Sequence, residues 1–167
     1  SLEPLEAEAR APEIIRRMCR AGQKTGVGPM AAVAGTMAQM LAERFRDASA
    51  DLIVENGGDT YLFSTKDRHI GILNMPDQAV RLCVPVAASE FPCSFCASSA
   101  TIGHSLSFGK ADLVVVRAGD ASLADAAATA LANALTGAEA MDAVLAKAQG
   151  WESLGLEGVF TQCEGKI

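Results

Sequence analysis

Residues 110–133 read KADLVVVRAGDASLADAAATALAN, and this stretch decides the fold that we expect. An apolar strand, Leu113 to Val116, is followed by a short polar turn and then by a helix. The helix carries three polar residues at intervals of four among alanines: Asp125, Thr129 and Asn133. Side chains spaced by four share one face of a helix, one turn apart. The helix therefore presents a stripe of oxygen-bearing groups.

The composition predicts one globular domain over residues 1–167. Half of the residues are apolar and a fifth are charged, which is typical of globular proteins with one core of ordinary size. The net charge of −6 argues against a nucleic-acid surface, which needs a basic patch. The protein would have to bind an anionic ligand through local groups, such as a helix N-terminus, Gly-rich backbone or a divalent cation, rather than through its overall charge.

Cysteine usage and hydropathy favour a cytoplasmic location. The five cysteines are odd in number and do not resemble a disulfide framework, which favours a reducing compartment. No apolar run approaches the roughly 20 residues that span a membrane, and no signal peptide is visible. The chain begins at Ser1 rather than with methionine, so we expect further residues before it in the full-length protein.

The order of expected elements predicts an α+β fold with helices packed on a mainly antiparallel sheet. We expect a first helix from Pro12 to about Ala21, closed by Gly22, and a second helix that starts at Pro29. The last helix should run to about Ala148, after a capping box formed by Thr136 and Glu139. The expected strands cover residues 52–55, 60–64, 69–73, 79–86, 113–116 and 158–163. The first four read as an antiparallel meander, and residues 91–109 read as a functional loop without a clear period.

The second helix has two unlike sides. Large apolar residues fall on one side at steps of three and four: Met30, Val33, Met37, Leu41 and Phe45. The other side begins with small residues: Ala31, Ala32, Ala34 and Gly35. These are too small to fill a core, but they let a small ligand or a closely packed strand approach the backbone.

Asp125 and Thr129 supply a carboxylate and a hydroxyl one helical turn apart. Hard cations such as Mg²⁺ take oxygen ligands and often bind through one or two protein groups plus substrate phosphates. The alternative is a capping box, in which Ser122 starts the helix and Asp125 bonds back to that start. Spacing alone favours the capping box, because short motifs of this kind often match by chance.

Two glycine-containing turns could bring backbone amides against a ligand. Asn56-Gly57-Gly58-Asp59 lies between two expected strands, and Asn-Gly is among the strongest hairpin signals, so a plain turn also explains it. Gly28 ends the sequence Gly-Val-Gly before the second helix, where a phosphate could bind at the helix N-terminus. A flexible entry to that helix explains the glycines equally well.

Cys93 and Cys96 form a C-x-x-C pair, and His104 follows in a Ser-rich segment. A structural zinc site needs a second pair of ligands, and no βαβ pattern supports a thioredoxin-like role. Two thiols in a loop are the simpler interpretation, and a redox or metal protein is an alternative. His104 could transfer protons or hold its loop by a hydrogen bond.

Three segments occur in the order found in the ApbE-like flavin transferases: residues 54–59, 103–105 and 123–130. The chain resembles most closely an uncharacterised branch of that superfamily. The signatures of this branch are similar to three stretches: GPMAAVAG at 28–35, ENGGD at 55–59 and SLSFGKAD at 105–112. In that branch residues 1–4 look like an internal position, so the resemblance also implies an N-terminal segment ahead of Ser1.

The resemblance implies an ApbE-like fold and a function. The flavin transferases use Mg²⁺ and FAD to attach FMN to a threonine of a partner protein. Their D-x-x-x-T pair supports the metal, which would carry onto Asp125 and Thr129. Their N-x-GG turn contacts the flavin nucleotide, which would carry onto residues 56–58, and a histidine corresponds most nearly to His104.

We add Asp59 and Gly28 to the expected nucleotide site. The sequence departs from the transferase pattern at two places. Gly35 and Thr36 stand where the transferases carry a lysine followed by glycine, and residues 104–109 replace their His-Ile-x-Asp-Pro segment. A non-catalytic flavin- or nucleotide-binding protein is therefore the alternative to an FMN transferase. Exposed strand edges are compatible with a homodimer.

Overall fold

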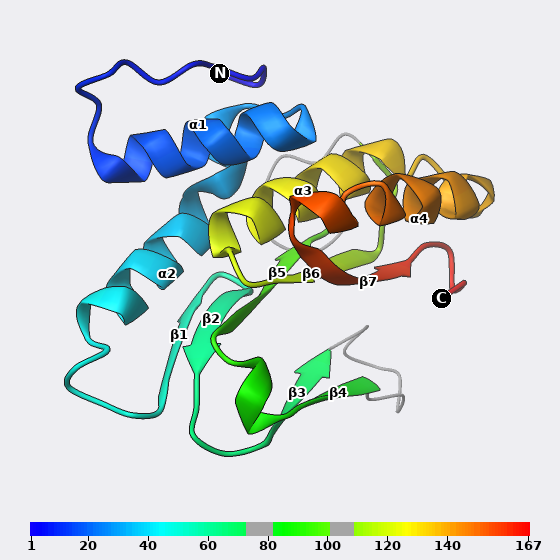
Figure 1. The fold of residues 1–167 in the computed structure, drawn as a ribbon. Coiled ribbons are helices and arrows are strands. Elements are labelled where there is room, and N and C mark those ends of the chain that lie inside the picture. Colours follow the sequence, from blue (N-terminus) through cyan, green and yellow to red (C-terminus); the bar gives the residue numbers. More distant parts are fainter. Residues whose placement is uncertain (73–81, 101–108) are drawn as a thin grey trace.

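The computed structural model describes residues 1–72, 82–100 and 109–167. Within these residues the chain forms helices packed on a mainly antiparallel sheet, which confirms the predicted α+β class (Figure 1). The α-helices are α1 (Glu13–Thr25), α2 (Val33–Arg44), α3 (Ala121–Ala134) and α4 (Met141–Gln149). The strands are β1 (Leu52–Asn56), β2 (Asp59–Phe63), β3 (Arg68–Ile72), β4 (Leu82–Val86), β5 (Cys93–Ser98), β6 (Leu113–Ala118) and β7 (Leu156–Gln162). Short 3₁₀ helices are η1 (Pro29–Ala32), η2 (Ala88–Glu90), η3 (Ala138–Ala140) and η4 (Glu152–Leu154).

The main sheet has the strand order β1-β2-β5-β6-β7, and its described neighbours are all antiparallel. The predicted continuous meander is wrong, because β2 pairs with β5 and the β3–β4 hairpin forms a separate sheet. Apolar residues of the hairpin, including Ile72 and Val86, pack with Leu62, Phe95 and Val115 of the main sheet. The hairpin therefore leaves the main sheet and covers one of its faces (Figure 1).

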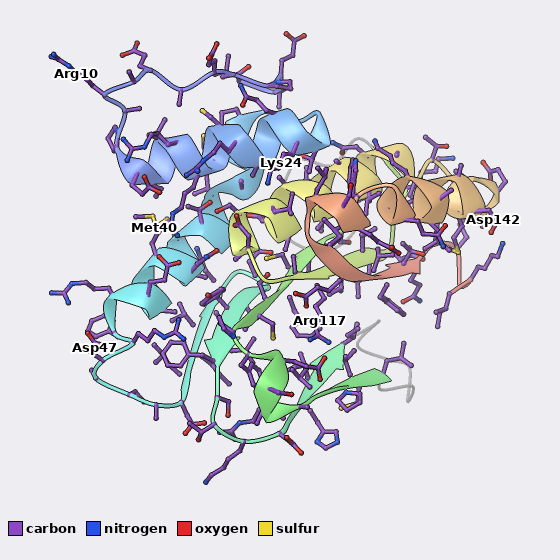
Figure 2. All side chains as sticks on the ribbon, viewed as in Figure 1. Arg10, Lys24, Met40, Asp47, Arg117 and Asp142 are labelled. Carbon is purple, nitrogen blue, oxygen red and sulfur yellow. The ribbon has the colours of Figure 1, made fainter. Side chains whose placement is uncertain are left out.

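Arg117 of β6 lies in the layer between the main sheet and the hairpin (Figure 2). It pairs with Glu90 at 2.8 Å and with Glu157 at 3.0 Å, and its guanidinium group lies 5.9 Å from the ring centre of Phe95. A cation over an aromatic ring is attracted by the negative face of the ring. The charge is thus held by partners on the rim of an otherwise apolar layer.

The predicted loop at residues 91–109 is wrong for its first part, because residues 93–98 form β5 in the centre of the sheet. Its side chains are buried on both faces, since helices cover one face and the hairpin covers the other. A strand buried on both faces has no polar and apolar alternation to reveal it. Residues 101–108 lie outside the described residues.

The helices α2, α3 and α4 cover the other face of the main sheet, and α1 packs on α3 further from the sheet (Figure 1). Most of the α3 alanines are fully buried. Alanine allows the sheet, α1 and α2 to approach α3 closely from several sides, because it carries no side chain beyond Cβ. The alanine-rich helix is therefore the centre of the fold.

The small side of α2 is the buried side, and α3 is what approaches it. A Cβ atom at Gly35 would meet the carbonyl oxygen of Ala121 and lie 2.8 Å from Cβ of Asp125. Large apolar side chains on the other side of η1 and α2, and at the end of α2, instead lie about half exposed or more: Met30, Met37, Leu41 and Phe45. Close helix packing, rather than a ligand or a strand, explains the glycine.

Three predicted helix boundaries are wrong. Helix α1 continues through Gly22 and ends at Gly26, whose backbone is left-handed. Helix α3 begins one residue before Ser122, with Asp120 as its N-cap. Neither η3 nor α4 has a side-chain cap, so Thr136 and Glu139 do not form the predicted capping box.

None of the helices in the described part of the chain combines the length and the apolar character needed to cross a bilayer.

Candidate functional site

A cleft of about 680 Å³ opens where the β1–β2 turn, the end of β5, the start of α2 and one face of α3 meet. Its volume lies in the range of small-ligand pockets, roughly 300–1,000 Å³. Six residues predicted for the site line it: Gly28, Asn56, Gly57, Asp59, Asp125 and Thr129. The other lining residues are Ser1, Leu2, Val27, Met30, Ala31, Val33, Ala34, Ala97, Ser98 and Asn133. The structure therefore brings together segments that are far apart in the sequence.

The polar stripe on α3 faces this cleft. Asp125, Thr129 and Asn133 all line it. The capping-box alternative is wrong, because the side chain of Asp120 accepts hydrogen bonds from the N–H groups of Ser122 and Leu123 at 2.8 and 3.3 Å. Asp125 therefore does not cap the N-terminus of α3, and its side chain points toward α2.

Asp125 is held by the N-terminus of α2. Its Oδ2 atom accepts a hydrogen bond from the N–H group of Gly35 at 2.8 Å, and the amide of Ala34 also lowers its pKa. The helix has no side-chain cap of its own. A carboxylate at a helix N-terminus satisfies unpaired N–H groups and interacts favourably with the helix dipole. Asp125 therefore joins α3 to α2 and also sets the position of a carboxylate in the cleft.

The Asn56–Asp59 hairpin turn was predicted correctly and brings two polar residues to the cleft. Gly57 and Gly58 have φ angles of 66° and 102°, the left-handed values that a type I′ turn requires at its two central residues. The N–H group of Gly58 donates to Oε1 of Glu55 at 2.7 Å, and Gly58 is not among the lining residues. Of the predicted turn residues, Asn56, Gly57 and Asp59 are therefore the ones at the cleft.

Asp59 and Asp125 form a buried pair of carboxylates. Asp59 is 5% exposed and accepts a hydrogen bond from the N–H group of Ala97 at 3.0 Å, whereas Asp125 is 8% exposed. Burial raises the pKa of Asp59 to about 6. Burial, and then the negative charge of Asp59, raise the pKa of Asp125 to about 8. A buried negative charge lacks solvation at either carboxyl group, and the charge of Asp59 also disfavours a negative charge on Asp125.

This donor set fits a hard divalent cation. Asp59 and Asp125 offer carboxylate oxygens, and Thr129 offers a hydroxyl group in the same cleft. The described residues hold no group of three or more His, Cys, Asp and Glu side chains arranged for a metal. Mg²⁺ usually keeps several waters and binds through one or two carboxylates plus substrate phosphates. A cation here would therefore complete its ligand shell with water or a bound anion.

Cys93 and Cys96 do not form a redox or metal pair. Residues three apart on a strand point to opposite faces of the sheet, and the two thiols belong to different apolar clusters, on opposite faces of β5. Both are fully buried. Burial raises the pKa of Cys93 to about 11 and that of Cys96 well above its ordinary value. The interpretation as two free thiols is correct, but they lie in a strand rather than in a loop.

Two further predicted residues differ in outcome. Gly28 lines the cleft, where a Cβ atom would collide with the backbone of Ser1 and Leu2, so it allows the first residues to lie against the α1–η1 connection. His104 lies outside the described residues.

Sequence reasoning missed several lining residues. Ala97 and Ser98 come from β5, which was expected to be a loop, and therefore gave no usable signal. Asn133 was left out of the predicted site although it shares the spacing of Asp125 and Thr129. That spacing was the signal that could have found it.

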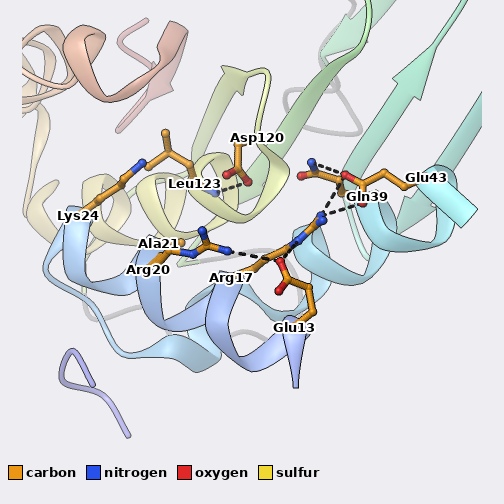
Figure 3. A pocket seen from close by; sticks show the side chains of 9 residues that line it. All are labelled: Glu13, Arg17, Arg20, Ala21, Lys24, Gln39, Glu43, Asp120 and Leu123. Atoms are coloured by element: carbon orange, nitrogen blue, oxygen red, sulfur yellow. Dashed lines mark hydrogen bonds and ion pairs between the residues drawn. The ribbon is translucent and has the colours of Figure 1, made fainter. Parts of the chain in front are cut away.

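A second, smaller cleft of about 380 Å³ lies between α1, α2 and the start of α3 (Figure 3). Arg17 crosses it and pairs with Glu43 at 2.9 Å and with Glu13 at 3.1 Å. Arg20 also pairs with Glu13, at 3.4 Å. Both arginines thus already have acidic partners, and the Arg17–Glu43 pair ties α1 to α2. The larger cleft remains the better candidate for a functional site.

The fold and the larger cleft define an α+β protein with a cleft of small-ligand size that contains two buried carboxyl groups. The chain belongs to the family described as AbpE bacteria, whose profile matches residues 1–166.

The chain is also similar to archaeal UPF0280 proteins. The protein from Methanocella arvoryzae is 46% identical over 134 residues, which cover 80% of this chain and 55% of the relative. The Archaeoglobus fulgidus protein is 48% identical over 134 residues, covering 80% and 54%. The Methanosarcina acetivorans protein is 38% identical over 173 residues, covering 100% and 68%. The chain thus spans about half of the length of the first two relatives.

Proposed function

We propose that this chain binds a flavin nucleotide such as FAD in the larger cleft, together with Mg²⁺, as a member of the ApbE-like superfamily. The observation that carries the proposal is the convergence of Asp125 and Thr129 with the turn that contains Asn56, Gly57 and Asp59. These segments carry the resemblance to the flavin transferases, and they line one cleft. The family description, AbpE bacteria, is compatible with the proposal but names no ligand.

The walls of the cleft have unlike chemistry, which suits a nucleotide with a flat ring. Leu2, Val27, Met30 and Val33 provide apolar contacts that can cover the faces of a heteroaromatic ring. The carboxylates and Thr129 lie on the polar side. There a divalent cation held by Asp59 and Asp125 would neutralise the negative charge of a pyrophosphate group.

We propose FMN transfer as the activity, with FAD as donor and a protein threonine as acceptor. In that reaction the threonine oxygen bonds to the phosphorus of the FMN half, the pyrophosphate P–O bond breaks, AMP leaves, and the hydroxyl proton passes to a base. His104 is the proposed base on the strength of the resemblance. The acceptor protein would be a separate partner.

A non-catalytic nucleotide-binding protein is the second candidate, and one observation favours it. At the place of the transferase lysine, Gly35 has no side chain to offer. The Thr36 hydroxyl contacts the carbonyl oxygen of Ala32 and lies 2.9 Å from Oγ of Ser122, so it points into the helix packing. Neither residue therefore supplies a cationic side chain to assist a phosphoryl transfer.

Calorimetric titration of FAD into the protein tests the binding proposal. We expect binding in the presence of Mg²⁺ and a loss of Mg²⁺ dependence in Asp125→Asn, which keeps a hydrogen-bond acceptor for Gly35. Asp47→Asn is the matched control, because Asp47 is exposed beyond the end of α2 (Figure 2) and the substitution removes the same charge. Absence of any FAD binding, with and without Mg²⁺, would refute the proposal.

Release of AMP separates the two candidates. We expect chromatography to detect AMP from FAD when the protein, Mg²⁺ and a threonine-containing acceptor are incubated together. The non-catalytic candidate would be favoured if FAD binds but no AMP is released. It would be favoured further if no flavin becomes attached to any protein in a cell extract of an organism that carries a member of the family.

A further inference from the structure

Strand β1 forms one edge of the main sheet. Among the described residues it pairs with β2 alone. Asn56 and Asp59 flank a two-residue turn, so they form a hydrogen-bonded pair, and such pairs alternate with non-bonded pairs along an antiparallel ladder. The backbone N–H and C=O groups of Ile53 and Glu55 therefore point away from β2, toward the open edge of the sheet.

This edge lacks the features that usually prevent pairing between molecules, such as lysine, proline or a bulge. The β1 sequence, Leu-Ile-Val-Glu-Asn, contains neither lysine nor proline and pairs with β2 without a register shift. The side chain of Glu55 accepts a hydrogen bond from the N–H group of Gly58, which draws it toward the turn. The other edge strand, β7, has a register shift against β6. Strand β1 is therefore the edge better suited to accept another strand.

The outer side of α2 adds an apolar surface beside this edge. Helix α2 packs over β1 and β2, whereas α3 packs over β5 and β6 (Figure 1). Gly35 faces α3, and Met37 and Leu41 lie on the opposite side of α2, because successive helical residues are about 100° apart. These two side chains therefore point past β1, and both are about half exposed.

We propose that two copies of this chain associate through β1 and the outer side of α2. The two β1 strands pair antiparallel about a twofold axis at Val54, so that Ile53 of each copy lies opposite Glu55 of the other. This register satisfies the outward backbone groups of both residues and places no like charges opposite each other. The same surface serves both partners, as a twofold contact requires, and the main sheet continues through both copies.

The spacing of the elements suits this arrangement. Paired strands lie about 4.8 Å apart, so α2, over the gap between β1 and β2, lies about 5 Å from the axis. The two α2 helices are then about 10 Å apart, close to the usual distance of packed helices. Met37, Leu41, Phe45 and Ile53 expose roughly 400 Å² per copy; two copies with their strand edges reach the roughly 1,000 Å² that a specific interface buries.

The proposed dimer also reaches the larger cleft. Asn56 at the end of β1 lines this cleft, and in the proposed register it lies opposite Leu52 of the second copy. The residues that precede Leu52 in one copy therefore lie beside the glycine turn of the other, at the rim of its cleft. The dimer proposal does not rest on the proposed ligand.

The test measures self-association of the chain by sedimentation over a range of micromolar concentrations, without added ligand. The variants are Ile53→Pro and Leu41→Lys, which change the strand edge and the helix side separately. Proline is tolerated where the N–H group of an edge strand faces away from the sheet, so it removes a bond between copies and keeps the ladder to β2. Ile15→Lys is the control, because Ile15 is an exposed apolar residue on α1. Circular dichroism checks the fold of each variant.

For the wild type and the control we expect a species of twice the 17.3 kDa mass of one chain. Both interface variants should associate at least about tenfold more weakly, because each loses a bond or places a charge in an apolar contact. Hydrogen exchange followed by NMR should show slow exchange of the Ile53 and Glu55 amides in the dimer and fast exchange in Leu41→Lys. The Val54 amide, which faces β2, should exchange slowly in both.

Three results overturn the proposal. The first is a wild type that stays monomeric at every concentration, which would leave this surface to a different partner. The second is a dimer that Ile53→Pro and Leu41→Lys weaken no more than Ile15→Lys does. The third is a dimer in which the Ile53 and Glu55 amides exchange as fast as in the monomer, because such a dimer uses another surface. None of these results bears on FAD binding, which is measured separately.

Discussion

Replacing Asp125 by asparagine should change how the stability of the protein depends on pH. In the folded chain the pKa of Asp125 is raised from 3.8 to about 8, by burial and then by the charge of Asp59. In the unfolded chain it should return to about 3.9. Between these two values the folded state keeps a proton that the unfolded state has released. The free energy of unfolding therefore falls as pH rises through this window.

The expected size follows from the two pKa values. One proton of difference between the folded and unfolded states changes the free energy of unfolding by about 1.4 kcal/mol for each pH unit. Between about pH 5 and pH 7, Asp125 should thus lower the stability of the wild type by roughly 3 kcal/mol. Asp59, whose pKa is raised to about 6 by burial, adds a smaller loss in the acidic part of this range in both proteins.

Other shifted groups in the described residues should not obscure the effect. The lowered pKa values of Glu13, Asp51 and Glu90 place their contributions below this range. Those of Cys93 and Cys96 lie above it, because burial raises their pKa values. The two buried carboxylates should therefore dominate between about pH 5 and pH 7.

The measurement is urea unfolding of the wild type, Asp125→Asn and Asp47→Asn across this pH range, in the absence of divalent cations. The free energy of unfolding of the wild type and of the Asp47 control should fall as pH rises. That of Asp125→Asn should fall by roughly 3 kcal/mol less across the range. Parallel profiles for the wild type and Asp125→Asn would show that Asp125 does not retain its proton, and would refute the reasoning.

Further predictions concern packing, capping, thiol chemistry and the cation. Gly35→Ala should lower the free energy of unfolding by about 1–3 kcal/mol, because the new Cβ meets α3; Gly71→Ala, which meets nothing within 4 Å, should cost less in the same urea unfolding experiment. Asp120→Ala should cost about 1 kcal/mol by removing the N-cap of α3, as measured by thermal and urea unfolding. A thiol reagent should react quickly with one cysteine, the exposed Cys83, and with Cys96 and the other buried thiols only after unfolding; rapid reaction of two thiols in Cys83→Ser would contradict the burial of β5. Mg²⁺ should raise the melting temperature more at about pH 8 than at about pH 5, because it competes with protons for the carboxylates, and calorimetry in buffers of different ionisation enthalpy should detect proton release.

Local sequence determined the elements whose conformation depends only on residues close together in the chain. The hairpin at residues 56–59 follows from Asn-Gly followed by a second glycine, because only such residues readily adopt two successive left-handed conformations. The strand that starts at Leu113, the helix after it and the closing strand were also predictable from apolar periods. The spacing of Asp125 and Thr129 identified one face of α3, and that face lines the cleft.

Tertiary structure decided which partner each of these elements meets. Residues 93–98 become a central strand because helices and a hairpin cover both of its faces, and neither cover is visible in the local sequence. The small side of α2 is buried, rather than the large apolar side, because α3 packs against it through Gly35. Burial is a property of the neighbours, so periodicity within one helix could not reveal it.

The candidate site shows the same division. The sequence supplied Asp59 at the end of a turn and Asp125 on a helix, each with an ordinary structural explanation. Only the folded chain brings the two buried carboxylates into one cleft, replaces the expected capping box by Asp120, and directs Asp125 to the amide of Gly35. Burial raises the pKa of both carboxyl groups, and the charge of Asp59 raises that of Asp125 further; burial and this repulsion depend on distances between residues that the order of the amino acids does not specify.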